Sequence, residues 1–262
     1  MNELLDLATR AAAAAATFLE QGWAQRAVVA TKSSSTDIVT QMDRGSESLL
    51  VELILSERPD DAILGEEGAS RQGSSGVTWV LDPLDGTVNY LYGFPAWAVS
   101  VGVVVDDRPV VGVVHAPALG TVWRGVAGEF AVANDEPIRG GEVVELERAL
   151  VATGFGYDPA VRARQGAIVA ELLPRIRDIR RAGAAAVDMC WVAQGVVDAY
   201  FERGTHLWDR AAAMAICDGA GVRVGGVDGG PATDPMTIAA NPGLFESLRS
   251  TLIELGVDDG QD

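Results

Sequence analysis

The 262-residue sequence predicts an α+β protein, with an antiparallel sheet in its first half and an α/β arrangement with a mixed sheet in its second. One observation is a series of β-type segments separated by short turns, at 96–105, 110–115 and 121–124, which favours an antiparallel meander. Another is the alternation of strand and helix patterns after residue 141, which is typical of α/β folds.

A stretch rich in glycine and charged residues, 125–141, separates subregions of about 1–140 and 141–262. Valine-rich segments flank it, which argues against a free linker. A chain of this length can bury a sizeable core, so we expect a single domain over 1–262.

The composition, 48% hydrophobic and 22% charged residues, is that of a globular protein. The net charge of −17 argues against binding to nucleic acid, which depends on Lys and Arg. No stretch is apolar for long enough to cross a bilayer, and Glu3 and Asp6 stand where a signal peptide would carry basic residues. Cys190 and Cys217 lie in apolar helix-like segments and are expected to be buried free thiols. We therefore expect a cytoplasmic protein with neither a membrane nor a nucleic-acid partner.

Two helices are predicted near the N-terminus. Apolar residues recur at helical spacing over 1–21, and a second apolar stripe follows residue 43 and ends before Pro59. Between them lies a polar segment with Lys32 and Asp37, whose simplest interpretation is a solvated loop. Asp43, taken alone, is a carboxylate at a helix start, which the helix dipole favours.

Two predicted strands of the first half end in acidic residues. The strand at 62–64 leads into Gly65-Glu66-Glu67-Gly68, and the strand at 77–81 leads into Asp82-Pro83-Leu84-Asp85-Gly86-Thr87. Two aspartates three residues apart on a tight turn can converge on one cation, and oxygen ligands suit Mg²⁺ or Mn²⁺. The alternatives are an ordinary Asp-Gly turn and an acidic surface loop.

The second half begins with a strand at 150–152, a glycine loop and a helix that ends at Pro174. A basic segment, 175–181, then leads through small residues into a helix around Met189. The start of this helix can hold an anion or a polyol hydroxyl, or the small residues can simply allow close packing. A strand over 196–201 ends at Glu202. A helix opened by Asp209, strands at 222–224 and 237–240, and a last helix over 242–255 follow.

Several catalytic motifs are absent from the sequence. It contains no nucleophile elbow, no phosphate-binding P-loop and no dinucleotide fingerprint. Only two histidines are present, and His206, near Asp209, is better explained as structural than as a general base. What remains is a set of acids at the ends of predicted elements: Asp43, Glu66, Asp82, Asp85 and Asp209. Brought together in space, they would bind two or three Mg²⁺ ions.

Three segments, in this order, resemble the signatures of the inositol monophosphatase family: Gly65-Glu66-Glu67, the run from Asp82 to Tyr90, and the run from Leu207 to Ala213. Residues 32–43 and 180–189 resemble two further family segments, and the resemblance extends from about residue 6 to 255. It implies a layered αβαβα sandwich, a lithium-sensitive phosphatase that uses two or three Mg²⁺ ions, and commonly a homodimer.

Residue by residue, the resemblance implies that Glu66, Asp82 and the Leu84 carbonyl bind one metal ion, and that Asp82, Asp85 and Asp209 bind a second. Thr87 and Asp43 match the pair that orients and deprotonates the attacking water, and with Glu66 they are the expected catalytic residues. Contacts with the substrate are implied for Gly86, Thr87, Gly183, Ala184, Ala185, Glu202 and Asp209.

The sequence departs from the family pattern at Ala184, where the family often has serine or threonine, and at 218–222. Neither departure affects an expected metal ligand. We expect hydrolysis of a small polyol phosphate, inositol 1-phosphate above others. Fructose 1,6-bisphosphate, histidinol phosphate and a 3′-phosphoadenosine nucleotide are the alternative substrates. A cation-binding interaction protein without catalysis is the alternative of a different class.

Overall fold

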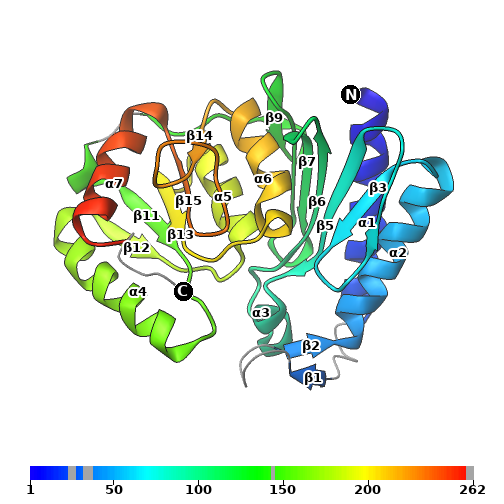
Figure 1. Ribbon diagram of the computed structural model, residues 1–262, viewed down its shortest axis with the longest axis horizontal. Coiled ribbons are helices and arrows are strands. Elements are labelled where there is room, and N and C mark those ends of the chain that lie inside the picture. The colour runs from blue at the N-terminus through cyan, green and yellow to red at the C-terminus, as the bar shows by residue number, and fades with distance from the viewer. Residues whose placement is uncertain (23–27, 32–37, 143–144, 258–262) are drawn as a thin grey trace.

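The computed structural model describes residues 1–22, 28–31, 38–142 and 145–257. Its α-helices are α1 (Asn2–Gly22), α2 (Gln41–Glu57), α3 (Thr87–Tyr92), α4 (Pro159–Leu172), α5 (Ala185–Gln194), α6 (Leu207–Gly219) and α7 (Pro242–Glu254). Figure 1 shows five layers, in which α1 and α2 cover one sheet, α5 and α6 lie between two sheets, and α4 and α7 cover the other. The expected layered αβαβα sandwich is therefore confirmed.

The first large sheet has the strand order β10-β9-β8-β7-β6-β5-β3-β4. These strands are β3 (Ala62–Gly65), β4 (Ser70–Arg71), β5 (Val77–Asp85), β6 (Ala98–Val105), β7 (Arg108–Ala116), β8 (Thr121–Val126), β9 (Phe130–Ala133) and β10 (Glu136–Pro137). The predicted meander is present in β6, β7 and β8. The stretch 125–141 contributes β9 and β10 to the same sheet.

The second sheet has five strands in the order β12-β11-β13-β15-β14 and is mixed, as expected. They are β11 (Leu150–Thr153), β12 (Asp178–Arg180), β13 (Ala199–Glu202), β14 (Arg223–Gly225) and β15 (Thr237–Ala240). Strand β12 falls in the basic segment, for which no strand was expected. Two short strands, β1 (Val28–Thr31) and β2 (Ile38–Thr40), form a separate antiparallel pair.

The expectation of a wholly antiparallel first sheet is wrong at one pair, because β3 and β5 run parallel. Periodicity in the sequence does not report strand direction, and the short β4 returns the chain to the far side of β3. Strand β5 also extends past its predicted end at Leu81. Its pairing with β6 is interrupted between Asp82 and Asp85, around Pro83, which cannot donate to the ladder.

Small residues let the helices approach the first sheet closely. Helix α1 buries a stripe that includes Ala8, Ala11, Ala12 and Ala15, as its helical spacing predicted. On the other face of the sheet, a Cβ atom at Gly112 would overlap the Ala212 carbonyl of α6. Helix α6 is thereby held near the strands, which places its first residues beside the first half of the chain.

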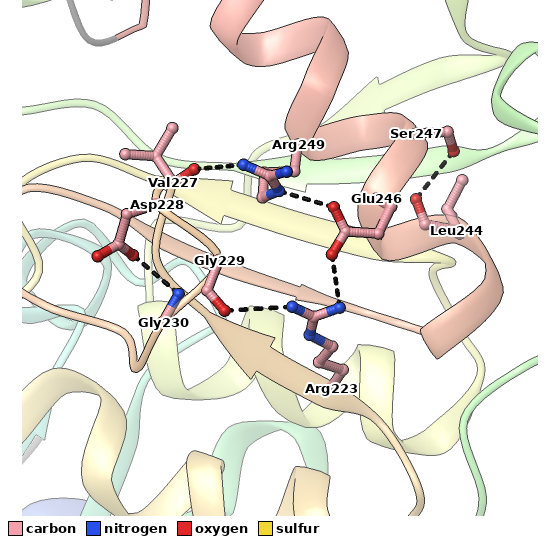
Figure 2. A network of polar contacts seen from close by, with 9 residues as sticks. All are labelled: Arg223, Val227, Asp228, Gly229, Gly230, Leu244, Glu246, Ser247 and Arg249. Atoms are coloured by element: carbon pink, nitrogen blue, oxygen red, sulfur yellow. Dashed lines mark hydrogen bonds and ion pairs between the residues drawn. The ribbon is translucent and has the colours of Figure 1, made fainter.

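A polar network attaches α7 to the neighbouring loop (Figure 2). Glu246 accepts hydrogen bonds from Arg223 of β14 at 2.7 Å and from Arg249 at 2.8 Å. The same two arginines donate to the carbonyls of Gly229 and Val227. These contacts lie at the outer edge of the second sheet, away from the site described below.

Both cysteines, Cys190 and Cys217, are buried free thiols, as predicted. Within the ranges described above, we find no helix with the length and apolar character needed for a membrane span.

Candidate functional site

The parallel pairing of β3 and β5 brings two acidic segments to one edge of the first sheet. Gly65 pairs with Leu81, and the Glu66 N–H donates to the Leu81 carbonyl at 3.1 Å. Glu66 and Asp82 therefore leave adjacent strands side by side. Asp82 is 1% exposed and accepts a hydrogen bond from the Leu84 N–H at 3.0 Å.

The turn after β5 presents Thr87 to a carboxylate of α2. Gly86 has a φ of 86°, a left-handed conformation that favours glycine and turns the chain into α3. The Thr87 hydroxyl lies 3.1 Å from Asp43 Oδ2 and 3.1 Å from the Leu84 carbonyl oxygen. A hydroxyl has one proton to donate, so the two acceptors share it. Thr87 and Asp43 are thus brought together as expected, although 44 residues separate them.

Asp85 links the two halves of the chain. Its carboxylate accepts hydrogen bonds from the N–H groups of Ala185 and Ala186 at 3.1 and 2.8 Å, at the start of α5. Of the two interpretations of this helix start, the anion site is present, but the anion is the Asp85 carboxylate of the chain itself. The two N–H groups satisfy Asp85, because a buried carboxylate is stabilised at a helix N-terminus.

Asp209 is the third residue of α6, and its side chain contributes to the N-terminal cap formed with His206. Asp209 Oδ2 accepts a hydrogen bond from the His206 N–H at 2.6 Å, and the His206 side chain completes a capping box. The His206 ring packs against Trp208, with centroids 4.8 Å apart. His206 thus contributes to the structure of this turn, as the sequence indicated.

A cavity of about 880 Å³ contains most of these groups. Its wall includes the segment from Phe155 to Asp158, Arg164 and Arg181 as well as the acids. Expected site residues that line it are Glu66, Asp82, Leu84, Asp85, Gly86, Thr87, Gly183, Ala185, Glu202 and Asp209. Two expected residues are absent from the wall. Asp43 lies behind Thr87, and Ala184 is 2% exposed and packs near Gly86.

Three aspartates in this cavity, Asp82, Asp85 and Asp209, resist ionisation. Burial, followed by the charge of Glu66, raises the pKa of Asp82 well above its usual value. Burial and Asp209 do the same for the pKa of Asp85, and burial raises the pKa of Asp209 to about 7. Carboxylates that repel one another in this way ionise together only when positive charge is added.

The donor set fits a hard divalent cation such as Mg²⁺, because all the side-chain donors are oxygens. In the described part of the chain, no three acidic, histidine or cysteine side chains form a compact cluster that encloses an ion. The carboxylates instead line an open wall, next to the Leu84 carbonyl. Mg²⁺ usually retains several water ligands and needs few protein ligands, so this open arrangement is compatible with it.

Glu202 ends β13 and faces the cavity rather than the surrounding solvent. It accepts a hydrogen bond from the Tyr200 hydroxyl at 2.8 Å, and a Cβ atom at Gly154 would overlap its carboxylate. Arg203, the next residue in the chain, donates to the Val257 carbonyl at 2.7 Å. Burial raises the pKa of Glu202, while the Tyr200 hydroxyl and Arg181 lower it.

Sequence reasoning did not single out several residues around the site. Ser46 and Glu47 of α2 are buried and bind the two acidic segments, and their spacing from Asp43 on one helix face was an available signal. Asp188 of α5 is fully buried next to Glu202, and no sequence pattern marked it. Residues 32–37 of the family-like segment, including Lys32 and Asp37, lie outside the described residues.

Comparisons with known proteins relate the whole chain to one family. The model of the inositol monophosphatase family matches residues 1–255. "Inositol-1-monophosphatase SuhB" of Mycobacterium tuberculosis is 43% identical over 242 residues, which cover 86% of this chain and 81% of that protein. "Nus factor SuhB" of Pasteurella multocida is 37% identical over 257 residues, 96% of both chains.

Solved structures show the same likeness. The M. tuberculosis SuhB structure has a TM-score of 0.84 and 40% identity, and the alignment covers 97% of each chain. The structure of the extragenic suppressor protein suhB from Bartonella henselae has a TM-score of 0.90 and 28% identity, over 95% of this chain and 98% of the other. The chain belongs to the inositol monophosphatase family.

Proposed function

We propose that this protein is a Mg²⁺-dependent phosphatase that hydrolyses inositol 1-phosphate to inositol and phosphate. Membership of a phosphatase family that is generally metal-dependent gives the reaction class. The observation that carries the proposal is the hydrogen bond between Thr87 and Asp43, beside a cavity lined with carboxylates. A cation site alone has no use for a buried hydroxyl and carboxylate pair, whereas hydrolysis needs groups that orient water and accept its proton.

In this proposal, the metal ions would be held by Glu66, Asp82, the Leu84 carbonyl, Asp85 and Asp209. When bound, they would supply the positive charge that stabilises the phosphate oxygens and the departing alkoxide. Hydrogen bonds with the neighbouring backbone already restrain Asp82 and Asp85, so little reorganisation is needed at these positions.

Side chains and backbone groups of the protein would carry out proton transfer and phosphate binding. The Thr87 hydroxyl donates to Asp43, which leaves its lone pairs free to accept a proton from the attacking water. As Thr87 accepts the water proton, its own hydroxyl proton passes to Asp43, so the pair gains one proton in total. Glu66 lies at the same edge of the sheet. Gly86 and Thr87 line the cavity, and in this proposal their N–H groups would donate to a phosphate oxygen.

Glu202, Gly183 and Ala185 form the proposed polyol side of the cavity. The Glu202 carboxylate would accept hydrogen bonds from ring hydroxyls, while Tyr200 fixes its orientation. Ala184 plays no direct part, because its side chain is buried against the Gly86 turn.

A second candidate substrate is fructose 1,6-bisphosphate, which two arginines favour. Arg164 and Arg181 line the same cavity, and within the described part of the chain neither forms an ion pair with a carboxylate. Three other arginines of the basic segment bind elsewhere: Arg175 to Glu254, Arg177 to the Arg148 carbonyl and Arg180 to Asp178. A second phosphate on the substrate would accept hydrogen bonds from these two guanidinium groups.

The alternative of a different class is an interaction protein without catalysis. Some relatives carry the name "Nus factor SuhB", so this alternative is tested alongside activity. We further propose a cytoplasmic homodimer inhibited by lithium, which light scattering and lithium titration of the activity would check.

The experiment is phosphate release from inositol 1-phosphate, fructose 1,6-bisphosphate, histidinol phosphate and a 3′-phosphoadenosine nucleotide, with Mg²⁺ and with EDTA. We expect Mg²⁺-dependent release with the highest kcat/KM for inositol 1-phosphate. Arg164→Gln should lower kcat/KM only for the bisphosphate. Arg181→Gln should lower it more for the bisphosphate than for inositol 1-phosphate, since the Arg181 charge also acts on Glu202. Arg108→Gln, on an exposed position of β7, serves as the control. Absence of release from every ester would reject the enzyme in favour of the interaction protein.

A further inference from the structure

Helix α2 carries three buried polar residues on the face that points toward the site. Asp43, Ser46 and Glu47 are 0, 0 and 7% exposed. Residues three and four apart share one face of a helix, so a single rigid element presents all three side chains. The rest of the buried surface of α2 is apolar, with Leu50 and Ile54 in the core. Burial of polar groups is costly unless each has a partner, so the partners define the role of this face.

Each of the three residues binds a different segment of the site. Asp43 binds Thr87, as described above. The Ser46 hydroxyl donates to the Pro83 carbonyl at 2.9 Å, between Asp82 and Leu84. Glu47 binds the loop that carries Glu66.

The Glu47 carboxylate accepts two backbone hydrogen bonds from this loop. Its Oε1 accepts from the Glu67 N–H at 3.0 Å, and its Oε2 accepts from the Ala69 N–H at 3.1 Å. A carboxylate that accepts two backbone N–H groups fixes both the position and the orientation of the loop between them. Glu66, which immediately precedes Glu67, is tied on its other side to the Leu81 carbonyl.

The pair of hydrogen bonds from Glu67 and Ala69 to Glu47, called the Glu47 clamp here, requires a residue without a side chain at position 65. A Cβ atom at Gly65 would overlap Glu47 Oε1, so any larger residue there must displace the carboxylate. The backbone of Gly65 has no left-handed φ, so alanine is tolerated conformationally. Its Cβ atom would meet the Glu47 carboxylate first and would lie 3.2 Å from the Ala69 Cβ.

We propose that Glu47 is a positioning residue for the metal site, and that it raises the affinity for the divalent cation by fixing the Glu66 loop from behind. Ser46 does the same for the Asp82 turn. The inference rests on the proposed function in one respect, because it takes Glu66 and Asp82 as ligands of the cation. Removal of a group that holds a metal ligand typically weakens binding by about 10–100-fold.

The test measures Mn²⁺ binding by electron paramagnetic resonance, together with the Mg²⁺ dependence of phosphate release and the Tm in EDTA. Glu47→Gln replaces one acceptor oxygen by a donor that faces an N–H group. Gly65→Ala moves the carboxylate but keeps its charge, and Ser46→Ala removes the contact with Pro83. Glu52→Gln, at an exposed position of the same helix, is the matched control.

We expect the Kd for Mn²⁺ to rise by about tenfold or more in Glu47→Gln and Gly65→Ala, and by less in Ser46→Ala. The kcat at saturating Mg²⁺ should stay near that of the wild type, and Glu52→Gln should change neither quantity. An unchanged Kd with a lower Tm would overturn the proposal and leave Glu47 a purely structural role. A higher Kd in Glu47→Gln but not in Gly65→Ala would also overturn it. The Mn²⁺ affinity would then depend on the charge of Glu47 and not on its hold on the Glu66 loop. If the wild type itself binds no Mn²⁺, the proposed function fails and the inference fails with it. If the wild type binds Mn²⁺ but the variants do not show the expected rise in Kd, the inference alone fails.

Discussion

Substitution of Asp188 by asparagine should stabilise the protein at neutral pH, because the buried carboxyl group is costly to ionise. Asp188 lies in the first turn of α5 and is 0% exposed. Neither of its oxygens forms a hydrogen bond of good geometry within the described residues. Burial, followed by the charge of Glu202, raises its pKa to about 8, although the N–H groups of Gly183 and Ala182 and the charge of Arg181 oppose the shift.

The direction of the pH dependence follows from this pKa. The folded protein holds a proton at Asp188 that the unfolded chain loses above its usual pKa of 3.8. The stabilising effect of that proton is complete below pH 4 and declines as the pH rises toward about 8. At roughly 1.4 kcal/mol per pKa unit, the cost at pH 7 has an upper limit of about 4 kcal/mol.

Urea denaturation between pH 5 and pH 9 measures this effect. The stability of the wild type should fall more steeply across this range than that of Asp188→Asn, and the variant should have its largest advantage above pH 8. Asp218→Asn, an exposed residue of α6, is the control and should leave the pH dependence unchanged. A loss of stability in Asp188→Asn that is equal at every pH would refute the reasoning, because it would mean that the carboxyl group makes a favourable contact in both protonation states.

Four further predictions concern residues of the proposed site. Asp82→Asn should abolish turnover at saturating Mg²⁺ while the Tm in EDTA holds or rises, since one source of repulsion is removed; wild-type kcat in this variant would contradict a ligand role for Asp82. Thr87→Ala should lower kcat by ~10²–10⁴-fold with Mn²⁺ binding retained, because general-base assistance is lost. Asp43→Asn should show a similar loss in steady-state assays, and full additivity in the double variant would argue against a functional pair. Glu202→Gln should weaken kcat/KM for inositol 1-phosphate by roughly 1–3 kcal/mol, the range for hydrogen bonds to charged groups, and leave p-nitrophenyl phosphate hydrolysis unchanged; equal losses on both substrates would exclude a ring contact.

Local patterns in the sequence predicted much of the fold. The helical spacing of apolar residues in α1 predicted its buried stripe, and β-type segments predicted β6, β7 and β8. These features follow from periodicity, which depends only on nearby residues. The motifs around Glu66, Asp82 and Asp209 likewise indicated an acidic site, since turn chemistry and strand ends can be recognised within a few residues.

Relations between distant segments could not be obtained in this way. The parallel direction of β3 and β5, which places Glu66 beside Asp82, depends on strand pairing across the sheet. The use of the α5 N–H groups by Asp85 joins residues 100 positions apart, so the helix start alone suggested a ligand site that the folded chain fills itself.

The sequence by itself determined which residue types form the site and which helices and strands carry them, because both can be recognised from patterns of a few neighbouring residues. Only the tertiary structure decided how these residues face one another. Burial of Asp188, the clamp of Glu47 on the Glu66 loop and the orientation of Glu202 by Tyr200 all arise from packing between elements. Such contacts, and the pKa shifts that burial causes, depend on neighbours that are close in space and far apart in the chain.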